Sequence, residues 1–208
     1  MNDGAGRGVL VAGLGSFGGA VASRLVALHH DRILVEWQHF ADALSPGMLA
    51  AVVAMSTPSP RASALIDLAA FRAKVPWLPV VRDVPQIRVG PLVVPGIGPC
   101  HRCFEKRRRQ HESGWSAMRG FEWAQERHQI SGPDECLPHH VSLASGLAEH
   151  MIQTVVTQAV LEPVHPLAGV VVVADLTSRA MTSGTVTSHH GCARCGYGSG
   201  AQGPVRDL

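Results

Sequence analysis

Four of the five cysteines in the sequence form two closely spaced pairs. Cys100 and Cys103 make one C-x-x-C pair, and Cys192 and Cys195 make the other. Two intervening residues let both thiolates of a pair turn toward one tetrahedral ion, and two such pairs complete a set of four ligands. Four thiolates leave no open coordination position, so the pattern predicts a structural zinc ion. Disulfide bonds and redox-active C-x-x-C pairs are the alternative interpretations.

Three further residues could take part in thiol or metal chemistry. His189 and His190 precede the second cysteine pair, and we expect them beside the metal or exposed to solvent, because four sulfur atoms already fill the site. Cys136 is the unpaired thiol. A catalytic role for Cys136 is one interpretation, and a small, buried apolar residue is the other.

A glycine-rich turn near the N-terminus is the second motif. Gly13-x-Gly15-x-x-Gly18 follows an apolar run and precedes a helical pattern, which is the context of a dinucleotide-binding turn. Such glycines let a phosphate approach the N–H groups of a helix N-terminus. Glu36, at the end of the next expected strand, could bond ribose hydroxyls. The other interpretation is a vestigial site that binds no ligand.

The hydrophobic pattern predicts the elements that must position these motifs. Apolar runs predict strands over 8–12, 32–36, 50–55, 76–81 and 87–94, followed by a strand pair over 169–174 and 181–187. Helical spacing is found over 19–29, from Pro58 or Pro60 to 73, and over 139–161, and residues 104–138 are expected to form helix and loop on the surface. Alternating strands and helices indicate βαβ units. The expected fold class is therefore α/β: a Rossmann-like, doubly wound, mainly parallel sheet with a C-terminal strand pair clipped by a Cys₄ zinc site.

The expected organisation is one domain with two parts and a tail. Residues 1–99 would form the Rossmann-like core, and residues 100–195 would be the zinc-clipped C-terminal part of the same domain. Residues 196–208 are rich in glycine and are expected to be a flexible tail.

Composition excludes several classes of protein. The 208 residues are 46% hydrophobic and 16% charged, with a net charge of +2; a disordered chain would carry more charge, and a nucleic-acid-binding protein would be more basic. No apolar run reaches the roughly 20 residues of a membrane span. Residues 9–22 could resemble a signal peptide, but four glycines in this stretch disfavour its helix. The expected location is the cytoplasm.

A basic run follows the first cysteine pair. Lys106, Arg107, Arg108 and Arg109 are consecutive. They could bind an acidic peptide or a partner subunit, or they could form the solvated face of a short helix. The second interpretation is favoured, because four charges without a wider basic surface do not make a nucleic-acid site.

Two longer stretches resemble a known family. The order of strand, glycine turn, helix and two distant C-x-x-C pairs resembles the ThiF/MoeB-like superfamily. The stretches VGPLVVPGIGPCHRCFEKRRRQHESGW (89–115) and TSHHGCARC (187–195) resemble, more narrowly, the ThiF-like partner proteins of YcaO cyclodehydratases. Those proteins serve in the biosynthesis of thiazole/oxazole-modified ribosomal peptides, including bacteriocins and thiopeptides. The resemblance extends from about Gly8 to Cys195 and implies a Cys₄ zinc site.

The sequence departs from the pattern of adenylating members of that superfamily. Active members carry an acidic pair and an asparagine–arginine run after the second strand, where this chain has VEWQHFAD (35–42). They also carry an aspartate after the third strand, where this chain has MSTPSP (55–60). The family's catalytic lysine falls between these elements, but no lysine precedes Lys74. Without these charges, adenylyl transfer would lack its electrostatic stabilisation, so ATP binding is not expected.

The leading functional hypothesis is a non-catalytic partner subunit that binds and activates a YcaO-type cyclodehydratase during azoline formation on a ribosomal precursor peptide. An expected strand at Gly8 leaves no room for the family's leader-binding lobe, so a separate small protein or another surface would bind the leader. An ATP-dependent enzyme that adenylates a peptide or protein C-terminus is the first alternative, and an NAD-binding oxidoreductase using Glu36 is the second. The oligomeric state stays open, although members of the superfamily often form homodimers.

Overall fold

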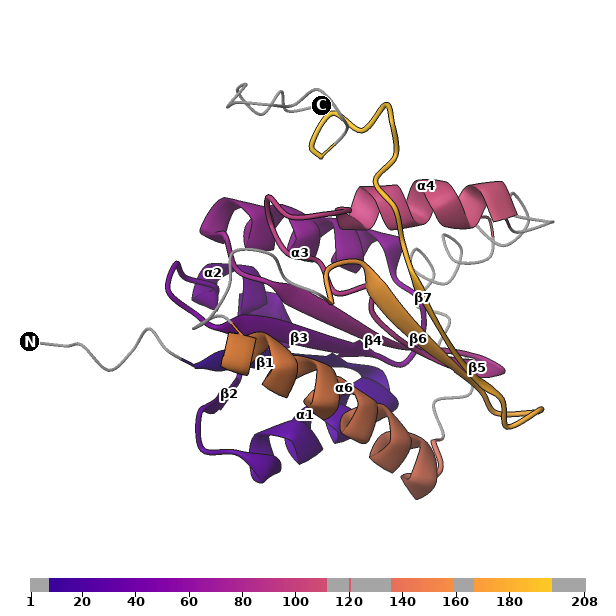
Figure 1. Cartoon of the computed structure of the whole chain (residues 1–208). Helices are drawn as coiled ribbons and strands as arrows, with labels where there is room; N and C mark the ends of the chain where they lie inside the picture. Colours follow the sequence, from indigo (N-terminus) through magenta and orange to yellow (C-terminus); the bar gives the residue numbers. More distant parts are fainter. Residues whose placement is uncertain (1–7, 112–119, 121–135, 159–166, 196–208) are drawn as a thin grey trace, which may run out of the picture.

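The computed structural model describes residues 8–111, 120, 136–158 and 167–195. Within these ranges, one seven-stranded sheet is covered by helices on both faces (Figure 1). The elements in chain order are β1 (Val9–Leu14), α1 (Gly15–Leu28), β2 (Arg32–Leu34), η1 (Trp37–His39), α2 (Phe40–Ala43), β3 (Ala50–Met55), α3 (Pro60–Ala73), β4 (Trp77–Asp83), β5 (Gln86–Val89), α4 (His101–His111), α6 (Pro138–Gln158), β6 (Val170–Asp175) and β7 (Met181–Thr185).

The sheet is mixed rather than mainly parallel. Its strand order is β2-β1-β3-β4-β5-β6-β7. The first four strands pair in parallel, as the alternating pattern predicted, but β5, β6 and β7 each pair antiparallel with the preceding strand. Only Val84 and Pro85 separate β4 from β5, and a connection this short permits only an antiparallel hairpin. The prediction of a largely parallel sheet is therefore wrong for this half.

The fifth strand is also shorter than expected. The sequence predicts a strand over 87–94, whereas β5 ends at Val89. Gly90 follows with a positive φ of 99°, a conformation that glycine adopts without strain. The chain then turns, and Val93 pairs with Trp77 at the start of β4. This turn directs the following loop toward α3 and brings the first cysteine pair there.

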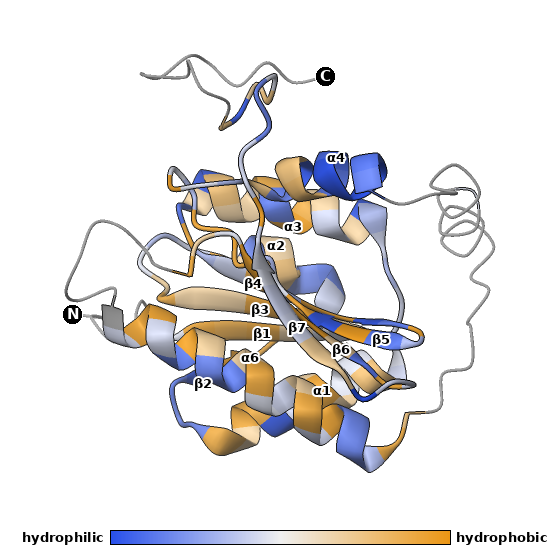
Figure 2. Cartoon of the chain, turned by 45° about the vertical axis from the view of Figure 1, so that its right-hand side comes forward, coloured by the Kyte–Doolittle hydropathy of each residue, from blue (hydrophilic) through white to orange (hydrophobic). Residues whose placement is uncertain are grey.

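Both faces of the central strands are buried. In β1, Val9 and Val11 belong to a core cluster with α1 and α6, whereas Leu10 and Ala12 belong to a cluster with α2 and α3. Successive side chains of a strand point to opposite faces, so a strand buried on both faces must be apolar throughout. The hydropathy colouring shows the inner strands in orange between the two helical layers (Figure 2).

Helix α3 shows where the apolar pattern was misleading. The Ser59 side chain accepts a hydrogen bond of 3.2 Å from the backbone N–H of Ala62, which caps the helix start as expected for serine. The helical spacing of the sequence places Ala62, Leu65, Leu68 and Ala69 on one apolar face, but Leu65 is 52% exposed. The buried face instead carries Ile66 and Asp67. The prediction is confirmed for Ala62, which is buried, and is wrong for Leu65, because the inward face is rotated to include the Asp67 carboxylate.

The C-terminal half adds the remaining helices and strands. Helix α4 begins at His101, so the first cysteine pair starts a helix, and α6 covers most of the predicted 139–161 helix. Ala144, Ala148 and Ile152 pack α6 against the sheet. The predicted C-terminal strand pair is confirmed as β6 and β7.

Some sequence predictions fall outside the described residues. They are most of the 104–138 region beyond α4, the end of the 139–161 helix, and the tail of residues 196–208. Among the described helices, none is long and apolar enough to cross a membrane.

Candidate metal centre

The four paired cysteines meet at one place between α4 and the segment after β7. Their sulfur atoms all lie within 4.8 Å of one another. The Sγ atoms of Cys100 and Cys103 are 3.9 Å apart, those of Cys100 and Cys192 are 3.6 Å apart, and those of Cys103 and Cys195 are 3.1 Å apart. The site thus joins two parts of the chain that are 88 residues apart in sequence.

This donor set fits a tetrahedral metal ion. A zinc–sulfur bond is about 2.3 Å long, so the edge of a ZnS₄ tetrahedron is about 3.8 Å. The measured separations scatter around that value, and the four cysteines are free thiols. Two independent redox pairs would not need to converge. The four residues could therefore hold one metal ion in a closed thiolate shell, and thiolates select soft or borderline metals.

Backbone N–H groups point at two of the sulfur atoms. The N–H of Cys100 donates to Sγ of Cys195 at 3.3 Å, and the N–H of His189 donates to Sγ of Cys103 at 3.2 Å. Each bond runs from one knuckle of the site to the other, where a knuckle is one C-x-x-C pair with its adjoining backbone. Such donors stabilise thiolate charge. His189 thus contributes its backbone to the site.

The thiols differ in acidity because their surroundings differ. The sulfur of Cys195 and burial together raise the pKa of Cys100, and burial raises the pKa of Cys103. Burial acts in the same direction on Cys192, but backbone N–H groups of Cys195 and Arg194 oppose it and lower the pKa of Cys192 to about 7. The pKa of Cys192 is thus shifted in the opposite direction to those of Cys100 and Cys103.

Asp67 on α3 connects the two knuckles, and sequence reasoning did not find it. Its side chain is 3% exposed. Oδ1 accepts hydrogen bonds of 3.3 Å from the Trp77 indole N–H and from the backbone N–H of His101. Oδ2 pairs with the guanidinium of Arg194. The signal available in the sequence was one carboxylate within the apolar run ALIDLAAF (64–71).

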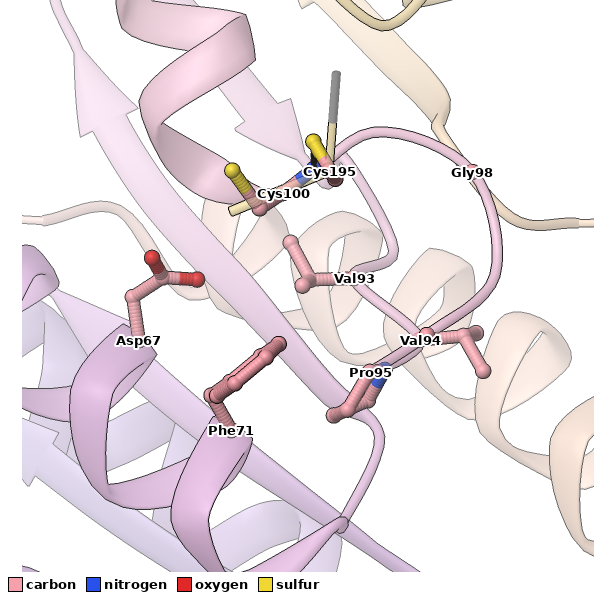
Figure 3. Close-up of a pocket in the computed structure, with 9 residues that line it drawn as sticks. Asp67, Phe71, Val93, Val94, Pro95, Gly98, Cys100 and Cys195 are labelled. Atoms are coloured by element: carbon pink, nitrogen blue, oxygen red, sulfur yellow. Dashed lines mark hydrogen bonds between the residues drawn. The ribbon is translucent and has the colours of Figure 1, made fainter. Parts of the chain in front are cut away.

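A small cavity lies beside the cysteines. It has a volume of about 10 Å³ and is lined by Asp67, Phe71, Cys100, Cys195 and the loop of residues 93–98. Figure 3 shows the Asp67 and Phe71 side chains projecting from α3 toward this loop. A space of this size accommodates about one water molecule, so this cavity cannot receive a substrate.

His101 is buried behind the first cysteine pair and does not join it. Its ring lies 5.3 Å from the Trp77 ring and 5.6 Å from the Phe104 ring, between centroids. Burial, together with the nearby Arg88 and Arg108 guanidinium groups, lowers the pKa of His101 to about 3. The imidazole is therefore neutral at physiological pH and serves as an aromatic packing group.

The basic run on α4 contacts neighbouring segments of the chain. Lys106 Nζ donates to the Gly191 carbonyl at 3.4 Å, and Arg107 Nη2 donates to the Ser188 carbonyl at 3.2 Å. Arg108 Nη2 lies 3.0 Å from Asp83 Oδ2. Lys106 and Arg107 thus fasten the segment before the second cysteine pair to α4, and Arg108 fastens the end of β4 to it. The end of α4 is correspondingly hydrophilic (Figure 2).

The glycine turn is held in place by hydrogen bonds to Ser56, the residue that follows β3. The backbone N–H groups of Phe17 and Gly18, in the first turn of α1, donate to Oγ of Ser56 at 3.0 and 3.4 Å. The Ser56 N–H donates in turn to the Leu14 carbonyl at 2.9 Å. Two backbone N–H groups in the first turn of α1 are thus already bonded to the hydroxyl of the residue that follows β3.

The other predicted residues of the nucleotide site are placed as follows. Gly13 and Gly18 lie in contact, since a Cβ built on Gly13 would be closer than 3.0 Å to the Gly18 backbone. Gly15 has a φ of 72° and begins α1. Glu36 is exposed and precedes η1. Cys136, the unpaired thiol, is half-buried against the core cluster under α6, as expected for a small apolar side chain.

Solved structures share this fold, but sequence comparisons find no relative. No protein-family model and no curated protein sequence matches the chain. The heterocyclase TruD superposes with a TM-score of 0.65 at 19% identity, over 92% of this chain and 28% of TruD. A chain of the E. coli microcin synthetase McbBCD complex gives 0.62 at 12% identity, over 93% of this chain and 70% of that one.

A third similar structure is E. coli MccB solved with ATP. It gives a TM-score of 0.55 at 14% identity, over 84% of this chain and 48% of MccB. The chain therefore spans about a quarter of the length of TruD and about half of the length of MccB. At these identities the similarity shows a common fold.

Proposed function

We propose that this chain is a ThiF-like partner subunit that binds and activates a YcaO-type cyclodehydratase during azoline formation on a ribosomal precursor peptide. The protein would position the enzyme and its peptide and would not itself perform a chemical step. In this proposal the parallel half of the sheet is a Rossmann-like core, and residues 100–195 form the C-terminal part of the same domain.

The observation that carries the proposal is the extent of the structural match. The fold of a heterocyclase and the fold of a microcin synthetase subunit each cover more than nine-tenths of this chain. One heterocyclase structure among the matches was solved with substrate and cofactor. A heterocyclase and a microcin synthetase subunit are thus both among the similar folds, which agrees with the family that residues 89–115 and 187–195 resemble.

The glycine turn supports a role without nucleotide chemistry. Ser56 already accepts hydrogen bonds from the first turn of α1, and a buried donor that gains a phosphate must first give up its present partner. The segments 35–42 and 55–60 also lack the charges that would balance a transferring adenylyl group. The nucleotide site, with Gly13, Gly15, Gly18 and Glu36, is in this proposal vestigial.

Zinc is the metal proposed for the four cysteines. Cys100, Cys103, Cys192 and Cys195 would bind it as thiolates, and four thiolates leave no position for a substrate. When bound, the ion would supply a cross-link between α4 and the chain after β7. Its contribution would be to stability and to the shape of the surface offered to the partner enzyme.

The proposal predicts that heterocyclisation depends on this chain. With a YcaO-type enzyme and a precursor peptide, addition of the chain should raise the rate of ring formation by about tenfold or more, because positioning two reactants lowers the entropic cost of their reaction. The measurement is the loss of 18 Da per ring by mass spectrometry, together with co-purification of the two proteins. Equal rates with and without the chain would contradict the proposal.

An adenylating enzyme is the second candidate function. The similarity to MccB, which was solved with ATP, favours it. Purified protein should then exchange pyrophosphate into ATP in the presence of a peptide C-terminus. Our proposal predicts exchange no higher than in a blank without protein. Exchange that depends on the peptide would establish the second candidate in place of the first.

A further inference from the structure

We infer that Asp67 and Arg194 form a positioning pair, which holds the second cysteine knuckle against α3 before the metal binds and thereby sets the affinity for the metal. This inference depends on metal binding by the four cysteines, which is one part of the proposed function. It does not depend on the peptide chemistry.

The first step is that one carboxylate reaches both knuckles. Oδ1 of Asp67 accepts from the backbone N–H of His101, between the cysteines of the first pair. Oδ2 of Asp67 pairs with the guanidinium of Arg194, between the cysteines of the second pair. Nη1 of Arg194 also lies 3.4 Å from the backbone carbonyl oxygen of Asp67. A rigid helix residue therefore fixes the distance between the two halves of the ligand set.

The second step is that Arg194 itself is held on two sides. Its guanidinium carbon lies 4.9 Å from the centre of the Phe71 ring, one turn further along α3 from Asp67. The side chain of Arg194 is 13% exposed. A planar guanidinium that both pairs with a carboxylate and stacks on a ring has little freedom. The backbone of the residues on either side of Arg194, including Cys195, is therefore also restricted in its motion.

The third step is the energetic consequence. The segment 186–195 contains no helix or strand, so ordering its backbone costs about 1–2 kcal/mol per residue. If Asp67 and Arg194 hold the segment without a metal, that ordering is already in place when the ion arrives. Binding to a preorganised site is tighter, because the metal no longer has to order its own ligands.

The chain contains a matched control for the experiment. Arg102 has the same place in the first pair, C-H-R-C, as Arg194 has in the second, C-A-R-C. Arg102 is exposed, whereas Arg194 is half-buried. Replacing either arginine by alanine removes one positive charge at the same sequence position of a C-x-x-C pair. A difference between the two variants therefore reports the contacts that Arg194 makes with α3 and not the loss of a charge between two cysteines.

The test is a chelator competition for Zn²⁺ on wild-type protein, R194A, R102A and the double variant D67N/R194A. The double variant is included because Arg194→Ala alone leaves a buried carboxylate without its counter-charge, which can destabilise the core. We expect the zinc affinity of R194A and of the double variant to fall by about 10- to 100-fold, the usual effect of losing a group that orients a ligand. R102A should stay within about twofold of wild type.

Hydrogen exchange on the metal-free proteins gives a second readout. Amides of residues 186–195 should be protected in wild type and in R102A, and should exchange about tenfold faster or more in the two Arg194 variants. Equal zinc affinity of R194A and R102A would overturn the inference. A double variant without a folded core would overturn it as well. A wild-type protein that binds no metal would also overturn the zinc part of the proposed function.

Discussion

Replacing Cys103 by serine is expected to abolish metal binding and to lower the melting temperature by about 8–16 °C. Cys103 is fully buried, and its sulfur lies 3.1 Å from that of Cys195 and 3.9 Å from that of Cys100. A metal present at 1,000 times its dissociation constant stabilises a protein by about 4 kcal/mol. For a domain of this size, 1 kcal/mol corresponds to about 2–4 °C. Metal content by elemental analysis and melting by calorimetry are the two measurements.

Chelation and a second variant control this result. Removing the metal from wild type with a strong chelator should lower its melting temperature to that of C103S, because both leave the same empty site. Cys136→Ser should keep one equivalent of metal, because Cys136 packs under α6 and belongs to no ligand cluster among the described residues. Retention of one equivalent by C103S would refute the assignment of Cys103 as a ligand.

Replacing Gly18 by alanine is expected to destabilise the fold by about 3 kcal/mol. A Cβ on Gly18 would lie closer than 3.0 Å to the backbone oxygen of Ala54 in β3. The backbone cannot yield without disturbing the pairing of β1 and β3, and overpacking of this kind costs about 1–3 kcal/mol or more. The gain in helix propensity from glycine to alanine is at most about 1 kcal/mol, so the steric effect exceeds it. Urea denaturation measures the difference.

Gly19 is the matched control, because it is the next residue of the same helix. No atom lies within 4 Å of a Cβ built there. Alanine at Gly19 should therefore be neutral or should stabilise the protein by up to about 1 kcal/mol. An equal effect of G18A and G19A would show that close packing against β3 is not what requires glycine in this turn. The pair thus separates a packing role of the motif from general helix propensity.

The sequence predicted the elements with continuous patterns well. Residues 50–55 are apolar throughout, and β3 has these bounds. The switch to antiparallel pairing after β4 depends instead on a two-residue connection at Val84 and Pro85. The apolar runs on either side do not show how short this connection is. Periodicity reports which residues are buried, but the direction of a strand follows from the length of its connection.

The candidate metal site was predictable in its ligands but not in its supports. The spacing within two C-x-x-C pairs is enough to identify four cysteines as candidate metal ligands. Asp67 was not identifiable, because an aspartate on a helix is usually a surface residue. It is buried here because the Trp77 indole, a backbone N–H and Arg194 together satisfy its oxygens. Those partners come from three separate parts of the sequence, so only the fold could show that they meet.

The distance in sequence between the two halves of the ligand set also orders events during synthesis. The second pair leaves the ribosome 88 residues after the first, which takes about 4–18 s at 5–20 residues per second. All four parallel strands, β1 to β4, lie before residue 84 and can pair during this interval. The first cysteine pair offers only half of a coordination shell over the same period. We therefore expect metal loading to follow assembly of the parallel sheet, so that a nascent chain stalled before Cys192 would be folded in part but unable to retain the ion.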